Sequence, residues 1–194
     1  SIDPAVFHDD DGEYYMYFGG LWGGQLQLYR NNTYNAANTE PQPGQPALGP
    51  LVAKLSGDMK QLAESPKELS IVDDKGRPLP AGDNSRRFFE ASWMHKYAGK
   101  YYFSYSTGDT HFICYAVGDS PYGPFTYKGV VLQPVVGWTH HHSIVEINGG
   151  WYLFYHASSL SNGVTHITPS KVTALPHISD GTTRALAPLA TPTI

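Results

Sequence analysis

Apolar positions gather in short, aromatic-rich runs, and the most informative of these runs occurs three times. Each copy begins at a turn glycine and continues as a strand: Gly12–Phe18, Gly99–Tyr105 and Gly149–Tyr155. A short run that ends in two apolar residues precedes each copy, and a further strand-like run follows it. Aromatic runs that start at glycine turns are typical of antiparallel hairpins. The pattern therefore predicts a repeated antiparallel unit of three or four strands.

The repeated unit has the size of a propeller blade, roughly 45 to 90 residues, with no helical periodicity between copies. We expect an all-β fold: a β-propeller of which only about three four-stranded blades are present in this chain. The whole chain, 1–194, is predicted to be a single partial β-propeller domain, with blades at roughly 1–68, 87–133 and 137–180. A β-sandwich is the alternative. Two segments rich in turn-forming residues, 31–50 and 73–84, are predicted to be surface loops.

Composition supports the all-β prediction and excludes two classes of partner. The 20 Gly and 15 Pro residues supply turns, and the 14 Tyr, 8 Phe and 4 Trp residues favour strands. The 13 basic residues are outnumbered by 17 acidic ones, so there is no broad positive field and we expect no nucleic-acid partner. No apolar run approaches the roughly 18 residues that a membrane helix needs, so we expect no membrane partner.

The single cysteine and the N-terminal sequence say less about function. Cys114 cannot form an internal disulfide and lies in an apolar strand-like run, so we expect a buried thiol. No basic segment followed by an apolar stretch opens the sequence, but a processed protein would look the same. Both a secreted and a cytoplasmic location therefore stay open.

An ionisable residue opens the first strand of each repeated unit. Asp3 and Glu90 each stand nine residues before their turn glycine, and His141 stands eight before its own. The opening strand of a blade lines the central channel, so we expect these three side chains to converge there. Two carboxylates and an imidazole in one channel indicate a catalytic or metal site. Each residue also has an ordinary structural explanation. Asp3 is typical of an Asp-Pro turn, and Glu90 could point to water from an edge strand. A cluster of histidines is often hydrogen-bonded within a strand.

Three runs around these residues, 1–12, 87–93 and 139–146, together with 151–156, resemble glycoside hydrolase family 43. The most similar members are β-xylosidases and α-L-arabinofuranosidases. The resemblance implies a five-bladed propeller and inverting hydrolysis by a general base, a general acid and an aspartate that modulates the pKa of the acid. It matches Glu90 to the acid and Asp3 to the modulator. No cofactor is required for this chemistry.

The resemblance also matches His141 to a channel histidine that, in many members, binds a central calcium ion directly or through water. A structural Ca²⁺ near His141 is therefore expected, and His141 is assigned to substrate binding as well. Trp22 and Trp138 are candidates for stacking on sugar rings, with ordinary packing as the alternative.

The general base of the family lies in the first blade, upstream of the Asp-Pro motif that here contains Asp3. We therefore expect the base to come from outside this chain. Three blades do not readily close a ring, so another chain, either the rest of the propeller or a second copy, is expected to cover the open edges. The expected function is hydrolysis of xylo- or arabino-oligosaccharides from hemicellulose. The alternatives are a non-catalytic carbohydrate-binding propeller fragment, an oligomerising remnant and an interaction module.

Overall fold

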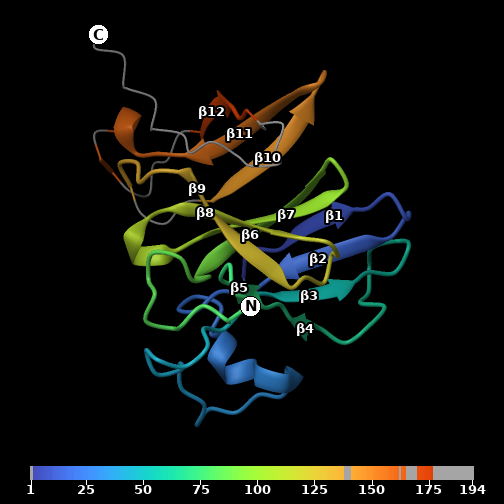
Figure 1. Cartoon of the computed structure of the whole chain (residues 1–194), viewed down its shortest axis with the longest axis vertical. Coiled ribbons are helices and arrows are strands. Elements are labelled where there is room, and N and C mark those ends of the chain that lie inside the picture. The colour runs from blue at the N-terminus through green and yellow to red at the C-terminus, as the bar shows by residue number, and fades with distance from the viewer. Residues whose placement is uncertain (1, 138–140, 162, 165–169, 177–194) are drawn as a thin grey trace.

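The structure is a computed structural model that describes residues 2–137, 141–161, 163–164 and 170–176. Within these residues the strands form three sheets, which lie one above another in Figure 1. The first sheet has the order β1 (Ala5–His8), β2 (Tyr14–Phe18), β3 (Leu51–Lys54), β4 (Lys67–Glu68). The middle sheet has the order β5 (Ile71–Val72), β9 (Phe125–Leu132), β8 (Ile113–Gly118), β7 (Lys100–Ser106), β6 (Glu90–Tyr97). The third sheet has the order β10 (His142–Ile147), β11 (Gly150–His156), β12 (Ser170–Ala174).

The three aromatic runs form the second strands of hairpins, as the sequence predicts. β1 pairs antiparallel with β2, β6 with β7, and β10 with β11. The turns between them carry Gly12, Gly99 and Gly149, all with positive φ, a conformation that glycine adopts without a steric penalty. The all-β prediction is therefore confirmed.

The middle sheet is buried on both faces, which explains why its aromatic strand has so few polar positions. Successive side chains of a strand point to opposite faces. Tyr101, Phe103 and Tyr105 pack into the core shared with the first sheet, whereas Tyr102 packs with Leu153 of the third sheet in a second core. Strands buried on both faces read as continuous apolar runs. The middle sheet thus holds the first and third sheets together.

The middle sheet contains a strand that the sequence pattern does not predict. β5 is only two residues long and pairs in parallel with β9, so this sheet has five strands within the described residues instead of four. Ile71 and Leu69 are buried in the core, and the Phe125 N–H donates to the Ser70 carbonyl. A pairing so short is set by tertiary packing and leaves no period-2 signal in the sequence.

Three short 3-10 helices complete the described elements: η1 (Leu26–Asn32), η2 (Gly108–Thr110) and η3 (Ser159–Ser161). η1 enters the segment predicted to be a surface loop at 31–50. None of the helices in the described residues has the length and apolar character needed to cross a bilayer.

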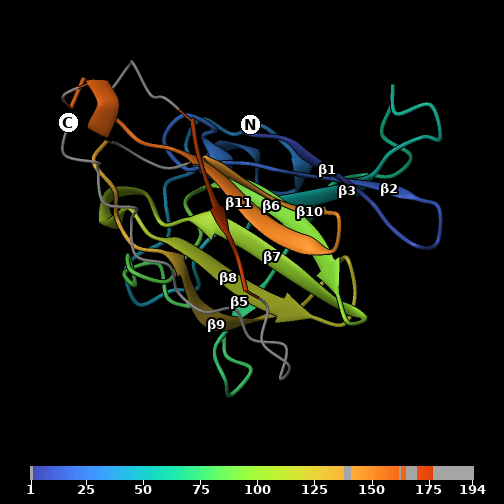
Figure 2. The ribbon, with the colours of Figure 1, turned by 90° about the horizontal axis from the view of Figure 1, so that it is seen from above.

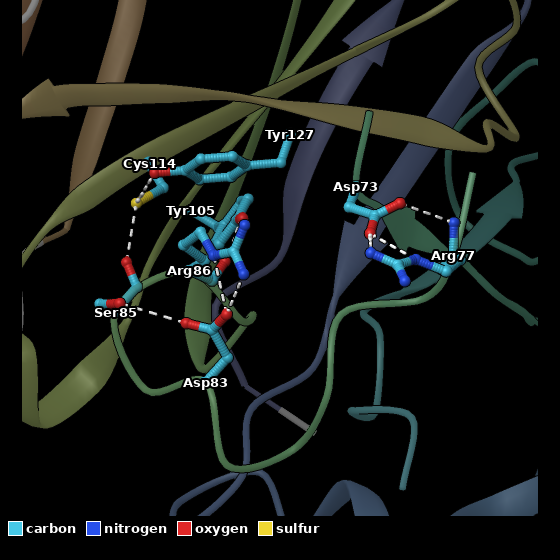
Figure 3. A network of polar contacts seen from close by, with 8 residues as sticks. All are labelled: Asp73, Arg77, Asp83, Ser85, Arg86, Tyr105, Cys114 and Tyr127. Atoms are coloured by element: carbon cyan, nitrogen blue, oxygen red, sulfur yellow. Dashed lines mark hydrogen bonds and ion pairs between the residues drawn. The ribbon is translucent and has the colours of Figure 1, made fainter. Parts of the chain in front are cut away.

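Cys114 is buried and belongs to a structural network of polar side chains (Figure 3). Its thiol donates to the Ser85 carbonyl at 3.6 Å and lies 3.9 Å from the Tyr127 hydroxyl. Nearby, Arg86 forms an ion pair with Asp83 at 2.5 Å. Burial raises the pKa of Cys114 to about 12. The thiolate is the reactive form of cysteine, so this residue is a packing thiol, as expected from its apolar run.

Candidate functional site

The three opening strands lie side by side, and this places their first residues in one group. β6 contacts both β1 and β10, and the three strands run together in Figure 2. Asp3 precedes β1, Glu90 is the first residue of β6, and His141 precedes β10. One ligand atom from each of these residues lies within 4.8 Å of the other two. Residues far apart in the sequence thus form a single cluster of two carboxylates and one imidazole.

A β-bulge shapes this cluster. The pairing of β6 with β7 jumps from Glu90↔Ser106 to Trp93↔Ser104, so β6 carries one extra residue. Ala91 within the bulge has a φ of 59°, in the left-handed region. Its N–H donates to Asp3 Oδ2 at 3.2 Å. Bulges re-aim side chains and backbone groups locally, and here the bulge ties the Asp3 carboxylate to the residue after Glu90.

Glu90 is buried, at 8% exposure, rather than facing water at a sheet edge. Close backbone packing encloses it. A Cβ atom on Gly20 would lie 3.5 Å from Glu90 Cβ and only 2.8 Å from the Ile2 side chain. The Leu21 N–H, next to Gly20, donates to the Phe89 carbonyl. The loop after β2 therefore lies in ordinary contact with the glutamate, and a larger residue at position 20 would press on Ile2.

The imidazole of His141 interacts with the Asp3 carboxylate. Its Nε2 lies 3.1 Å from Asp3 Oδ2. The hydrogen bond to Asp3 raises the pKa of His141, burial opposes this effect, and the charges of Asp3 and Glu90 raise the pKa further. The His141 side chain is half exposed and that of Asp3 is 16% exposed. The cluster therefore forms a charged, partly open site with Glu90 at its buried side.

Trp22 lies near this site, with 63% of its surface exposed. Its ring packs edge-on against Phe89, with centroids 5.1 Å apart and an interplanar angle of 80°. The Arg87 guanidinium is 5.3 Å from the centre of the same Phe89 ring. An exposed indole held by an edge contact has a free face, which suits a sugar ring. Trp138, the other stacking candidate, lies outside the described residues.

Two residues beside the cluster make contacts that the sequence pattern does not predict. His142 Nε2 is 2.6 Å from Ser104 Oγ, a contact between β10 and β7 that fixes the residue after His141. Arg87 donates from Nε to the Ala81 carbonyl and to Asn84 Oδ1. Arg87 stands three residues before Glu90, and this spacing was the only hint in the sequence that it lies near the cluster. Its contact with the Phe89 ring follows from the fold.

The donor set of the cluster fits a calcium ion only in part. Carboxylate oxygens suit Ca²⁺, which takes six to eight oxygen ligands. Asp3 and Glu90 supply carboxylates, but the third donor is the imidazole of His141, and this nitrogen already faces Asp3. These three side chains alone do not make a calcium site, so a calcium ion bound here would need several water ligands.

Solved structures of family 43 enzymes share this fold. The enzyme of subfamily GH43_1 from Xanthomonas citri superposes with a TM-score of 0.96 at 57% identity, covering 100% of this chain and 59% of that one. A β-xylosidase/α-arabinofuranosidase from a compost metagenome, solved with xylotriose in a calcium-free form, gives 0.94 at 62% identity, covering 98% of this chain and 59% of that one. The three sheets are therefore blades of the family propeller, present in part.

Sequence comparison agrees with the structural match. A β-xylosidase from Xylanibacter ruminicola is 61% identical over 181 residues, which is 93% of this chain and 56% of that protein. A xylosidase/arabinosidase from Bacteroides ovatus is equally similar over the same lengths. The chain thus spans somewhat more than half the length of these relatives. The model of the glycosyl hydrolases family 43 matches residues 1–182. The chain belongs to glycosyl hydrolase family 43.

Proposed function

We propose that this protein is a glycoside hydrolase that cleaves xylo- or arabino-oligosaccharides of hemicellulose with inversion. The observation that carries the proposal is the convergence of Asp3, Glu90 and His141, with donor atoms within 4.8 Å, in a chain of family 43. The names of the relatives give the substrate class, and two solved relatives are described in complex with xylotriose.

Glu90 is the general acid that protonates the leaving oxygen of the glycosidic bond, and Asp3 is the modulating carboxylate beside it. An inverting acid and base stand about 6.5 to 9.5 Å apart, because a water molecule must fit between base and sugar. The Asp3 and Glu90 oxygens, within 4.8 Å, are too close for that arrangement. This separation supports Asp3 as a modulator rather than as the base. His141 holds Asp3 through the 3.1 Å contact and, with Trp22 and Trp138, binds the sugar.

On this proposal the base is supplied by a part of the propeller other than these three sheets. Each outer sheet presents apolar side chains on the face opposite its core. Val6 of the first sheet is 48% exposed, and Val145 and Val172 of the third are 38% and 48% exposed. The rest of the propeller, or a second copy of this chain, covers these faces. On this proposal the blades occupy roughly 1–68, 87–133 and 137–180, and β5 joins the second blade from outside its range.

Release of xylose from xylotriose, whose sugar leaving group needs protonation, tests the catalytic assignment in the chain combined with the part of the propeller that supplies the base. Glu90→Gln should lower turnover by about 10²- to 10⁴-fold, the contribution usual for a general acid. Glu146→Gln is the matched control, because Glu146 is exposed on β10, away from the cluster. Turnover that is equal in the two variants would remove Glu90 as the acid.

A non-catalytic carbohydrate-binding fragment is the second candidate. The spacing of the two carboxylates in the described cluster favours this candidate. They lie too close together to act as an inverting acid and base. Binding of xylotriose in calorimetry, with no xylose released after prolonged incubation of the chain with its completing polypeptide, would favour this candidate. An oligomerising remnant or interaction module would bind no sugar.

A structural calcium ion is proposed at His141, with water completing its coordination. A ligand that binds only the folded state stabilises it by about 2.7 kcal/mol at a hundredfold excess over its Kd. Adding Ca²⁺ to chelator-treated protein should therefore raise the Tm, and His141→Ala should abolish the increase. His156→Ala is the control, because His156 stacks on His141 but is not in the donor cluster. An equal increase in all three proteins would contradict the assignment.

A further inference from the structure

A separate cavity of about 240 Å³ lies between η1 and the strands β3 and β4. η1 is the blue coil at the bottom of Figure 1. None of the residues that line this cavity belongs to the Asp3–Glu90–His141 cluster. Drug-sized pockets usually enclose about 300 to 1,000 Å³, so this one is suited to a smaller ligand of about one ring.

The cavity combines an apolar wall with a free cation. Leu26 and Leu48 are buried residues that line it, with Leu51 beside them. Arg30 also lines it, and its guanidinium forms no ion pair or hydrogen bond with any residue that the structure describes. Lys67, the other cation in the lining, is already engaged: its Nζ is 2.6 Å from Glu64 Oε2 and lies over the Tyr122 ring.

The strand side of the cavity supplies a hydrogen-bond acceptor. Glu68 lines the cavity, and its Oε1 accepts a hydrogen bond from the Gly49 N–H at 2.9 Å. Gly49 cannot be replaced there, because a Cβ atom would lie 1.7 Å from the Leu69 carbonyl oxygen. The Glu68 carboxylate is thus fixed by the backbone and keeps lone pairs for a further donor.

The rim of the cavity has two further features. Tyr29 lines it with 42% of its surface exposed, and its ring lies 5.4 Å from that of Tyr34, which is 60% exposed. Asn31 and Asn32 both line the cavity with left-handed φ values of 56° and 57°. Asparagine adopts this region more readily than other non-glycine residues, so these two positions suit the chain reversal that shapes the rim. Asn32 is held by a hydrogen bond from its amide to the Pro66 carbonyl at 2.8 Å.

We propose that this cavity is a second carbohydrate-binding site, which holds one neutral sugar ring of a hemicellulose oligosaccharide away from the catalytic cluster. The aromatic rim and leucine wall suit the C–H face of the ring. The Arg30 fork donates to neighbouring hydroxyls, the Asn31 amide provides both donor and acceptor, and Glu68 accepts from a hydroxyl. The inference rests on the proposed function only for the class of sugar.

Calorimetric titration of xylotriose into the chain tests the proposal. We expect Arg30→Ala to weaken binding at this site about tenfold or more, the loss typical of a hydrogen bond from a charged group. Tyr29→Ala should also weaken it, whereas Tyr29→Phe should retain binding because only the ring face is used. Lys75→Ala is the matched control, since Lys75 is an exposed cation outside the cavity.

Glu90→Gln separates this site from the catalytic one. Arg30-dependent binding that persists in Glu90→Gln supports the second site, even if neither the wild type nor Glu90→Gln releases xylose from xylotriose and the hydrolytic proposal fails. The second site is overturned if the Kd for xylotriose agrees within twofold among Arg30→Ala, Tyr29→Ala and Lys75→Ala. This holds whatever Glu90→Gln does to turnover.

Discussion

Asp9 shows how much a single side chain can depend on its tertiary setting. It follows β1 in a run of three aspartates, yet its side chain is only 2% exposed. Lys96 Nζ contacts it at 2.7 Å and the Tyr101 hydroxyl donates to it at 2.6 Å. Burial alone would raise the pKa of Asp9, but these hydrogen bonds and that of the Asp10 N–H outweigh burial and lower it. Asp9 therefore links the first sheet to the middle sheet as a charged group.

Asp9→Asn should lower the free energy of unfolding by about 1 to 3 kcal/mol at pH 7, because a charged hydrogen bond is lost in a buried setting. A carboxyl with a lowered folded pKa stabilises above its unfolded pKa, near 4, and loses this effect as pH falls through the folded value. The difference between wild type and variant should therefore shrink below about pH 4. Urea unfolding at several pH values measures it.

Asp10→Asn is the matched control, since Asp10 contacts the same Lys96 at 2.9 Å but its side chain is 85% exposed. Exposed ion pairs contribute about 0 to 1 kcal/mol. If Asp9→Asn and Asp10→Asn lower the free energy of unfolding equally, the burial of Asp9 adds nothing to the stability of the contact between the sheets.

At the scale of elements, the turn after β7 supports the strand that carries Glu90. Gly108 opens η2 with a φ of 78°, and a Cβ atom at this position would lie 2.5 Å from Cγ of the Phe89 ring. Phe89 immediately precedes Glu90 and contacts Trp22. The glycine thus allows the turn to pack directly on the aromatic residue beside the proposed acid.

Gly108→Ala should destabilise the fold more than Gly76→Ala in thermal or urea unfolding. Both glycines have left-handed φ, which costs an alanine about 1 to 2 kcal/mol. A Cβ atom on Gly76 meets nothing within 4 Å, whereas Gly108→Ala adds overpacking against Phe89, about 1 to 3 kcal/mol more. Equal destabilisation would show that Phe89 moves aside at no cost.

At the scale of the whole molecule, the first and third sheets, as far as the structure describes the chain, each expose valines on the face opposite their core. Val6 and Met16 pair across β1 and β2 on the face opposite to Tyr15 and Tyr17, which pack in the core. The third sheet likewise turns Val145 away from its core. Valines on such a face bury apolar area when a neighbouring sheet packs against them. This arrangement is the physical basis of the proposed completing chain.

Replacing Val145 and Val172 together by Glu should weaken association of this chain with the rest of the propeller, or with its own copies, by about tenfold or more. Each valine would otherwise bury apolar area at the interface. Sedimentation over a range of concentrations measures the effect. Val136→Glu is the control, because Val136 is 56% exposed but lies outside the strands. Dissociation constants that do not differ from the control would contradict a role for this face.

The hairpins were predictable because their signal is local. Aromatic strands after glycine turns occur three times, and the ionisable residue that opens each unit occupies the same place in the pattern. The two-residue β5, the bulge at Ala91 and the burial of Asp9 were not predictable. Each depends on a partner distant in the chain: β9, Asp3 and Lys96 respectively.

The amino-acid sequence by itself determined the all-β class, the repeat and the identity of the residues that open each unit, because turn chemistry and alternation act over a few residues. The sequence also predicted that Asp3, Glu90 and His141 converge. Only the tertiary structure decided that their donor atoms lie within 4.8 Å of one another and that η1 encloses a cavity with β3 and β4. Separations of a few ångströms between distant segments follow from how the sheets pack, and no local pattern encodes them.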